Sequence, residues 1–146
     1  MRIVTPPIKS QGIKTKLLPW IQALMPSVPG RWIEPFLGTG VVAFNSGFRR
    51  AVLGDTNPHI IRFYQAVKER EITPLIVREY LQREGEILRK AGNKGYEHFT
   101  YVKDRFNREH DSLDFLFLSR AGFNGMMRFN RKGEWNIPFC QKPERF

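Results

Sequence analysis

The spacing of hydrophobic residues predicts helices and strands in a definite order along the chain. Within residues 14–25, four apolar side chains share one helical stripe, namely Leu17, Leu18, Ile21 and Leu24. The short β-prone runs 31–34 and 51–53 predict two strands, and residues 41–48 between them predict a helix. A strand–helix–strand start of this kind is typical of an α/β fold.

Helices are predicted to fill most of the chain after residue 57. Asn57-Pro58 and Thr73-Pro74 each place a capping side chain before a proline, which is typical of a helix start. The predicted helices cover residues 58–70, 74–88, 96–107 and 112–121, of which the last is rich in Phe and Leu and expected to be buried. Residues 128–139 alternate large and polar side chains around a glycine-containing loop, which predicts a β-hairpin. The order as a whole predicts an α/β core interrupted by a helical lobe.

The composition excludes several classes of protein. With 41% hydrophobic and 13% aromatic residues, the chain has enough apolar material for a packed core. Its apolar runs are too short to cross a bilayer, and a single cysteine, Cys140, excludes an intrachain disulfide framework. His59, His98 and His110 lack the spacing of a metal site and are interpreted as surface or capping residues. We therefore expect a cytoplasmic protein with no membrane partner and no metal.

The formal net charge of +10 is concentrated at the two ends of the chain. The first 33 residues contain five basic residues and no acidic one, and residues 120–146 contain six basic residues against two acidic ones. In the segment between them the charges nearly cancel. Clustered basic charge interleaved with aromatic residues is typical of nucleic-acid binding, and a solvated basic surface is the alternative.

A glycine turn, E-P-F-L-G-T-G from Glu34 to Gly40, lies between the first predicted strand and the helix that follows. Its two glycines allow the backbone to approach a ligand closely. Asp55, at the end of the second predicted strand, places a carboxylate over the same crevice, where it suits the two hydroxyls of a ribose. Position 43 is alanine where the dinucleotide fingerprint has its third glycine. A tight turn whose glycines serve geometry alone is therefore the alternative.

Three segments, in chain order, resemble one known family. The glycine turn with the later G-D-T-N-P resembles motif I and the acidic strand end of Dam-type (class alpha, D12 family) S-adenosylmethionine-dependent DNA adenine methyltransferases. Upstream, K-S-Q-G-I-K at 9–14 is similar to the family's K-W-A-G-G-K segment. Downstream, F-N-G-M-M-R-F-N at 123–130 and G-E-W-N-I-P-F at 133–139 resemble its Y-N-G-L-x-R-Y-N and G-x-F-N-V-P-F segments. The resemblance covers essentially the whole chain.

The resemblance implies a fold and a division into domains. Residues 1–57 are expected to form the N-terminal part of a Rossmann-like methyltransferase core that binds the cofactor. Residues 58–143 are expected to form a target-recognition domain, a helical bundle with its hairpin at 128–139. The rest of the catalytic core is expected to lie after residue 146.

The resemblance also implies a cofactor site for S-adenosylmethionine. Lys14 is expected near the methionine end of the cofactor and Asp55 at its ribose. Ser10 stands where the family usually has tryptophan, and Ile13 where it has glycine. The full set of implied cofactor residues is Ser10, Lys14, Glu34, Pro35, Phe36, Gly38, Gly40 and Asp55.

The matching tail implies contacts with double-stranded DNA. An arginine can grip the acceptor edge of guanine with two hydrogen bonds, and an aromatic ring can enter the gap left by an unpaired base. The alternative is a hairpin whose aromatic residues pack on the preceding helix. The positions that match DNA-facing residues, with the loop lysine as a phosphate contact, are Arg120, Phe123, Asn124, Met126, Arg128, Asn130, Lys132 and Pro138.

The family's catalytic tetrapeptide, D-P-P-Y or a close variant, does not occur in this sequence. That motif holds the extruded adenine so that its amino nitrogen faces the methyl group. We therefore expect the chain to be the N-terminal part of a longer or split enzyme, inactive alone, with a complementary C-terminal fragment as a partner. A non-catalytic DNA-binding module is the main alternative, and a nucleotide-dependent oxidoreductase fits the glycine turn but not the basic aromatic tail. G-A-T-C is one candidate DNA site.

Overall fold

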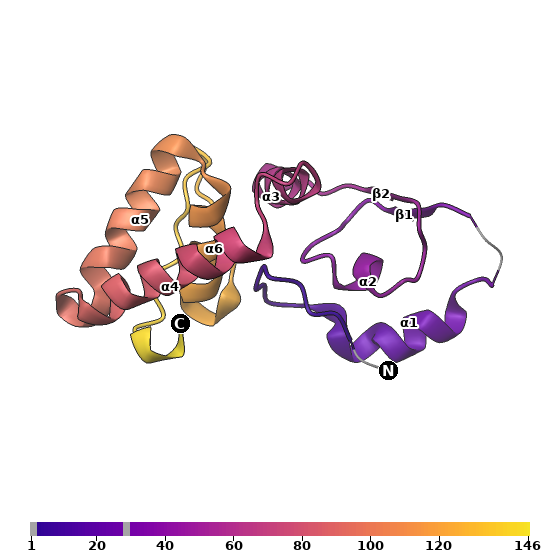
Figure 1. Cartoon of the computed structure of the whole chain (residues 1–146), viewed down its shortest axis with the longest axis horizontal. Helices are drawn as coiled ribbons and strands as arrows, with labels where there is room; N and C mark the ends of the chain where they lie inside the picture. The colour runs from indigo at the N-terminus through magenta and orange to yellow at the C-terminus, as the bar shows by residue number, and fades with distance from the viewer. Residues whose placement is uncertain (1–2, 28–29) are drawn as a thin grey trace.

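A small parallel sheet and a group of packed helices lie on either side of one helix, α3 (Figure 1). The computed structural model describes residues 3–27 and 30–146. Its α-helices and strands are, in order, α1 (Leu18–Leu24), β1 (Trp32–Glu34), α2 (Val41–Phe44), β2 (Ala51–Leu53), α3 (Pro58–Lys68), α4 (Pro74–Lys90), α5 (Tyr96–Glu109) and α6 (Ser112–Ala121). Short 3₁₀ turns occupy Lys14–Leu17, Asn93–Gly95, Phe123–Gly125 and Pro143–Arg145. None of the helices in the described ranges is long and apolar enough to span a bilayer.

The sheet consists of β1 and β2, which pair in parallel with Ile33 opposite Val52. Helix α2 lies in the connection between them. Because the strands are parallel, their carboxyl ends meet at one edge, which brings Glu34 beside the segment that leads to Asp55. The mixed fold with a parallel sheet confirms the predicted strand–helix–strand order and agrees with the α/β class.

Helix α2 is shorter than the predicted helix over 41–48. The side-chain amide of Asn45 donates to the carbonyl of Val41 at 2.7 Å and to the carbonyl of Val4 at 2.9 Å. Its oxygen accepts the amide of Val4 at 2.9 Å. Asn45 thus ends the helix and ties it to the N-terminal segment, as asparagine often does when it bonds to nearby backbone.

The predicted apolar stripe in residues 14–25 is wrong in part. Leu18 is buried, but Leu17 is 51% exposed and Leu24 is 86% exposed. Leu17 differs because Lys14–Leu17 is a 3₁₀ turn and the α-helix begins only at Leu18. The two helix types differ in residues per turn, so a stripe drawn at α-helical spacing does not continue across the junction. Leu24 belongs to the same α-helix as Leu18, but six residues of α-helix turn it about 120° away from Leu18.

The helical part is built around an aromatic core. The five consecutive residues Phe115–Ser119 of α6 are fully buried, so the expectation of a buried last helix is confirmed. Helices α3 and α5 bury aromatic rings in the same cluster as α6, namely Phe63, Phe99 and Phe106. These large rings dominate the apolar area removed from water.

The predicted hairpin at 128–139 is present as a turn with isolated antiparallel bridges and without a continuous ladder. Phe129 pairs with Trp135, and the amide of Asn130 donates to the carbonyl of Glu134 at 2.9 Å. Beyond this turn the second arm leaves the first, since Phe139 pairs with Gly122 after α6. The hairpin is therefore held against the end of α6.

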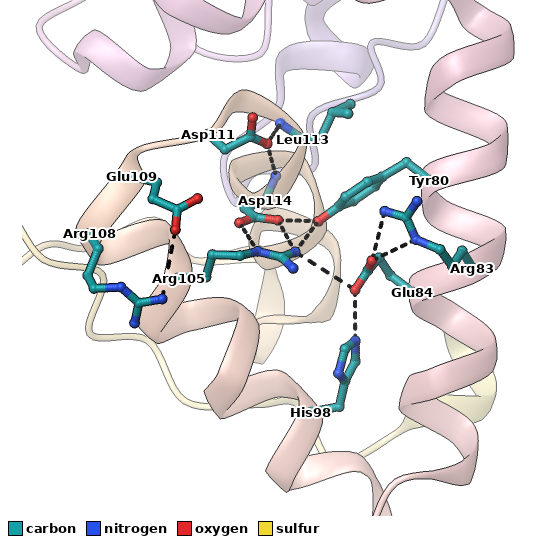
Figure 2. A network of polar contacts seen from close by, with 10 residues as sticks. All are labelled: Tyr80, Arg83, Glu84, His98, Arg105, Arg108, Glu109, Asp111, Leu113 and Asp114. Carbon is teal, nitrogen blue, oxygen red and sulfur yellow. Dashed lines mark hydrogen bonds and ion pairs between the residues drawn. The ribbon is translucent and has the colours of Figure 1, made fainter.

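A buried polar network joins α4, α5 and α6 (Figure 2). Arg105 contacts both carboxylate oxygens of Asp114, at 2.7 and 2.6 Å, and Tyr80 donates to the same carboxylate. Glu84 pairs with His98 at 2.9 Å. Burial and the hydrogen bond to Asp114 raise the pKa of Tyr80, so its phenol stays protonated. Buried charges are tolerated only when paired in this way.

Opposing influences act on the pKa of Glu84. Burial raises this pKa, but hydrogen bonds from His98 and Arg83 and the nearby positive charges outweigh burial and hold it below its usual value. The carboxylate is therefore favoured in its charged form in the folded protein.

We expect the free energy of unfolding to fall when the pH drops below about 4.5, the usual pKa of glutamate. Because the folded-state pKa of Glu84 lies below its unfolded-state value, its contribution is fully present above that pH and is lost as the pH falls through the folded-state pKa. Urea unfolding at a series of pH values measures this dependence. The variant Glu84→Gln should be less stable at neutral pH and should show a shallower acid slope. An unchanged slope would assign the acid sensitivity to other carboxylates.

Candidate functional site

The glycine turn joins the end of β1 to the start of α2. Gly38 and Gly40 adopt positive φ values of 54° and 85°, a region that side chains with a Cβ rarely enter. The turn is fixed by backbone hydrogen bonds, from Leu37 to the carbonyl of Gly54 at 2.8 Å and from Gly54 to the carbonyl of Glu34 at 2.9 Å. These bonds hold the segments that follow the two strands side by side.

Asp55 fastens this turn to the helix that follows the sheet. One carboxylate oxygen accepts the amide of Gly38 at 2.8 Å, and the other accepts the amide of Asn57 at 2.8 Å. Asn57 in turn caps α3 by accepting the amide of His59 at 3.0 Å. Each carboxylate oxygen has a second lone pair, so Asp55 can hold the turn and accept further hydroxyl donors.

A small pocket of about 100 Å³ lies between the N-terminal segment and the glycine turn. Five of the predicted cofactor residues line it, namely Ser10, Lys14, Glu34, Phe36 and Gly38. Of the other three, Pro35 and Gly40 belong to the same turn and Asp55 bonds to it. The carboxylate of Glu34 is held by the indole of Trp32 at 3.0 Å. Pockets for whole small molecules typically exceed about 300 Å³, so this pocket can enclose only part of a cofactor.

A second pocket, of about 150 Å³, lies beside the loop after α6 and is basic. Lys9, Arg120 and Lys142 contribute its positive charges, and Phe123 and Asn124 contribute an aromatic ring and an amide. We call it the basic pocket. Lys9 was not among the predicted site residues, although it begins the 9–14 match and belongs to the basic N-terminal cluster.

The segment 9–14 lies between the two pockets. Lys9 lines the basic pocket, whereas Ser10 and Lys14 line the pocket at the glycine turn. The amide of Gln11 donates to the carbonyl of Gly125 at 2.8 Å, which ties this segment to the loop after α6. Positions more than 100 residues apart in sequence are thus brought together.

Two of the predicted DNA-facing residues on the hairpin, Arg128 and Lys132, have exposed side chains, and a third, Asn130, stabilises the loop. Arg128 is exposed, with its Nε held by the amide oxygen of Asn136 at 2.9 Å, and Lys132 is exposed in the loop. Asn130 holds the loop, because its side-chain oxygen accepts the amides of Lys132 at 2.9 Å and Glu134 at 3.0 Å.

The remaining predicted DNA-facing residues lie near the loop after α6. Phe123 is 48% exposed, and its amide donates to the carbonyl of the exposed Pro138 at 2.9 Å. Arg120 is exposed and donates to the carbonyl of Pro7 at 3.2 Å. Met126 is half-buried and packs against the aromatic core.

The interpretation of the histidines as surface or capping residues is wrong for two of the three, which are buried. His98 is 8% exposed because its ring pairs with the buried Glu84. His59 is 7% exposed because aromatic rings surround it. His110, at a positive φ of 55°, does end a helix, since its amide bonds to the carbonyl of Phe106.

Comparison with known proteins places these features in a family. A family profile described as D12 class N6 adenine-specific DNA methyltransferase matches residues 10–146. A protein named DNA adenine methylase from Vibrio cholerae O395 is 34% identical over 136 residues, which are 90% of this chain and 46% of that protein. Its namesakes from Haemophilus influenzae Rd and Escherichia coli K12 are 36% identical over 139 residues (92% and 46%) and 35% identical over 111 residues (73% and 37%). The chain thus spans about half the length, or less, of these curated relatives.

We expect alanine to be tolerated differently at three glycines. Gly40→Ala should destabilise most, since it forces a side chain into the left-handed region and places Cβ 2.6 Å from the ring of Phe44. Gly38→Ala meets no atom within 4 Å and should cost only the backbone strain, about 1–2 kcal/mol. Gly30→Ala, with no such φ and open space around it, is the matched control. Urea unfolding measures all three, and equal effects would contradict the ranking.

Proposed function

The chain belongs to the D12 class of N6 adenine-specific DNA methyltransferases, and we propose that it forms the cofactor-binding and DNA-binding part of such an enzyme. The reaction is the transfer of a methyl group from S-adenosylmethionine to the N6 amino group of adenine in duplex DNA. One observation carries the proposal. The two segments that resemble the family's cofactor motifs, 9–14 and 34–40, line a single pocket.

The residues at the glycine turn fit the cofactor that the family implies. We propose that Asp55 accepts the ribose hydroxyls with the lone pairs left free by Gly38 and Asn57. Lys14 supplies a positive charge for the carboxylate at the methionine end. When bound, S-adenosylmethionine supplies an electrophilic methyl group. The part of the pocket formed by this chain is small, so we expect weak cofactor binding by these residues alone.

The basic pocket and the hairpin are proposed to bind duplex DNA. Lys9, Arg120 and Lys142 supply charge for phosphates. Arg128 presents a planar fork whose Nε is already held by Asn136, which leaves its terminal nitrogens for a base edge. Phe123 is exposed beside this pocket as an aromatic wedge for a gap in the duplex.

These assignments divide the chain into a cofactor-binding part and a DNA-binding part. We propose that residues 1–57 belong to a Rossmann-like core and that residues 58–143 form the target-recognition domain. The sequence contains no Pro-Pro-Tyr. The groups that accept the adenine amino protons are therefore proposed to come from protein outside these 146 residues, such as a complementary C-terminal part.

A DNA-binding module without cofactor is the second candidate. The small volume of the glycine-turn pocket favours it, beside a basic pocket that needs no cofactor. Separate titrations with S-adenosylhomocysteine and with duplex DNA distinguish the two candidates. Binding of both ligands supports the methyltransferase proposal, whereas binding of DNA alone supports the module.

We expect DNA affinity to fall steeply with salt, since binding to phosphates releases counterions. For roughly four phosphate contacts, the association constant should drop about a hundredfold between about 50 and 200 mM salt. Lys132→Ala should weaken binding to all sequences alike and make the salt dependence shallower. Lys68→Ala on α3 removes the same charge away from both pockets and hairpin and serves as the control. Salt-independent binding would contradict the proposal.

We expect Arg128→Ala to relax discrimination at one guanine, at a cost of about 1–3 kcal/mol on the matched duplex. Arg128→Lys should recover little, because lysine lacks the planar fork. The measurement compares affinities for a duplex containing G-A-T-C with those for single-base substitutions of it. Arg131→Ala, which removes an exposed charge from the same loop, is the control. If Arg128→Ala weakens all duplexes by one factor, Arg128 contacts phosphate instead.

A further inference from the structure

The side chain of His59 occupies a site that neither pocket includes. It is stacked on Phe129 of the hairpin, with ring centroids 5.1 Å apart, and on His110, 5.2 Å apart. Phe106 of α5 approaches edge-on at 4.9 Å, and Phe115 of α6 lies at 5.8 Å. One residue of α3 thus contacts the hairpin and both helices on which the hairpin rests.

Within the described residues, this imidazole is surrounded by other rings. Its Nδ1 atom is buried and lacks a hydrogen-bond partner there. Burial, followed by the charges of His110 and Arg62, lowers the pKa of His59 to about 4. At neutral pH the imidazole is therefore uncharged and stacks on its neighbours as an aromatic ring.

The same residue is tied through its backbone to the glycine turn. The amide of His59 bonds to the side chain of Asn57, and the amide of Asn57 bonds to Asp55. The second oxygen of Asp55 bonds to Gly38 in the turn. Three consecutive hydrogen bonds, each between 2.8 and 3.0 Å, thus connect the wall of the cofactor pocket to the His59 backbone.

On the other side, the stacked ring reaches the part of the hairpin proposed to read DNA. Phe129 follows Arg128 directly and lies edge-on to Trp135 across the turn, with centroids 5.6 Å apart. We expect a displacement of the His59 ring to be passed to Phe129 and to the neighbouring backbone at Arg128. Packed aromatic cores transmit such movements because they leave little free space.

We propose that His59 is a positioning residue that couples the cofactor pocket to the DNA-reading hairpin. Binding of a cofactor against Asp55 and Gly38 fixes the start of α3, and the His59 ring then fixes the hairpin. The inference rests on the proposed function, since it needs both ligands. A parallel connection runs through Gln11 and Gly125, so His59 carries a large share of the coupling and not all of it.

The test measures how much S-adenosylhomocysteine tightens DNA binding. The dissociation constant of a fluorescent G-A-T-C duplex is determined with and without the saturating ligand, and the ratio is the coupling factor. Wild-type protein should give at least about fivefold coupling. His59→Ala should reduce the factor at least about threefold, whereas His59→Phe, which keeps a flat ring, should retain it. Leu88→Ala, in the buried core on α4, is a destabilising control that should also retain it.

Every outcome decides the inference. A full coupling factor in His59→Ala, or a wild-type factor of one with both ligands bound, overturns it and leaves the proposed function intact. If the wild-type chain fails to bind S-adenosylhomocysteine, DNA or both, the proposed function is overturned, and this inference with it. If His59→Ala does not fold, Phe129→Leu removes the opposite ring of the stack, and a retained factor there is equally contradictory.

Discussion

The carboxylate of Asp55 is the contact on which the arrangement of the site depends. It accepts one amide from the glycine turn, through Gly38, and one from the start of α3, through Asn57. Hydrogen bonds of this kind to a charged acceptor are stronger than those between neutral groups. The end of β2, the turn after β1 and the helix that leads to the helical lobe are therefore fixed relative to one another. A ligand that bonds to Asp55 meets a carboxylate whose position is already determined.

The helical lobe holds a short hairpin in place, although the hairpin has no continuous ladder of strand hydrogen bonds. Two devices do so. Aromatic rings fill the space between the helices and the hairpin, and the pairing of Arg105 with Asp114 locks α5 to α6 beneath it. Removing one partner of a buried ion pair is strongly destabilising, because it leaves an uncompensated buried charge. The packed helices thus support the hairpin that carries exposed side chains such as Arg128.

Local signals in the sequence were enough for most of the elements. The caps at Asn57 and Thr73 act as predicted, because each side chain accepts an amide in the first turn of its helix. Only the family resemblance predicted that segments 9–14 and 34–40 lie side by side. Their proximity depends on the path of the whole chain, which no local pattern reveals. The buried partners of Glu84 and the rings around His59 were not predictable, because they come from several elements without a common spacing. The stripe was wrong at Leu17 because a sequence pattern cannot reveal a switch from 3₁₀ to α geometry. It was wrong at Leu24 because six residues of α-helix turn this side chain away from Leu18.

We propose that one chain places a cofactor surface and a DNA surface on opposite ends of the 9–14 segment. Amide NMR spectra of the ¹⁵N-labelled protein, titrated with S-adenosylhomocysteine and then with duplex DNA, test it directly and detect weak binding. We expect the first ligand to shift the amides of Lys14, Gly38 and Asp55, and DNA to shift those of Phe123, Asn124 and Arg128. Shifts confined to other regions, or no shifts at millimolar S-adenosylhomocysteine, would contradict it.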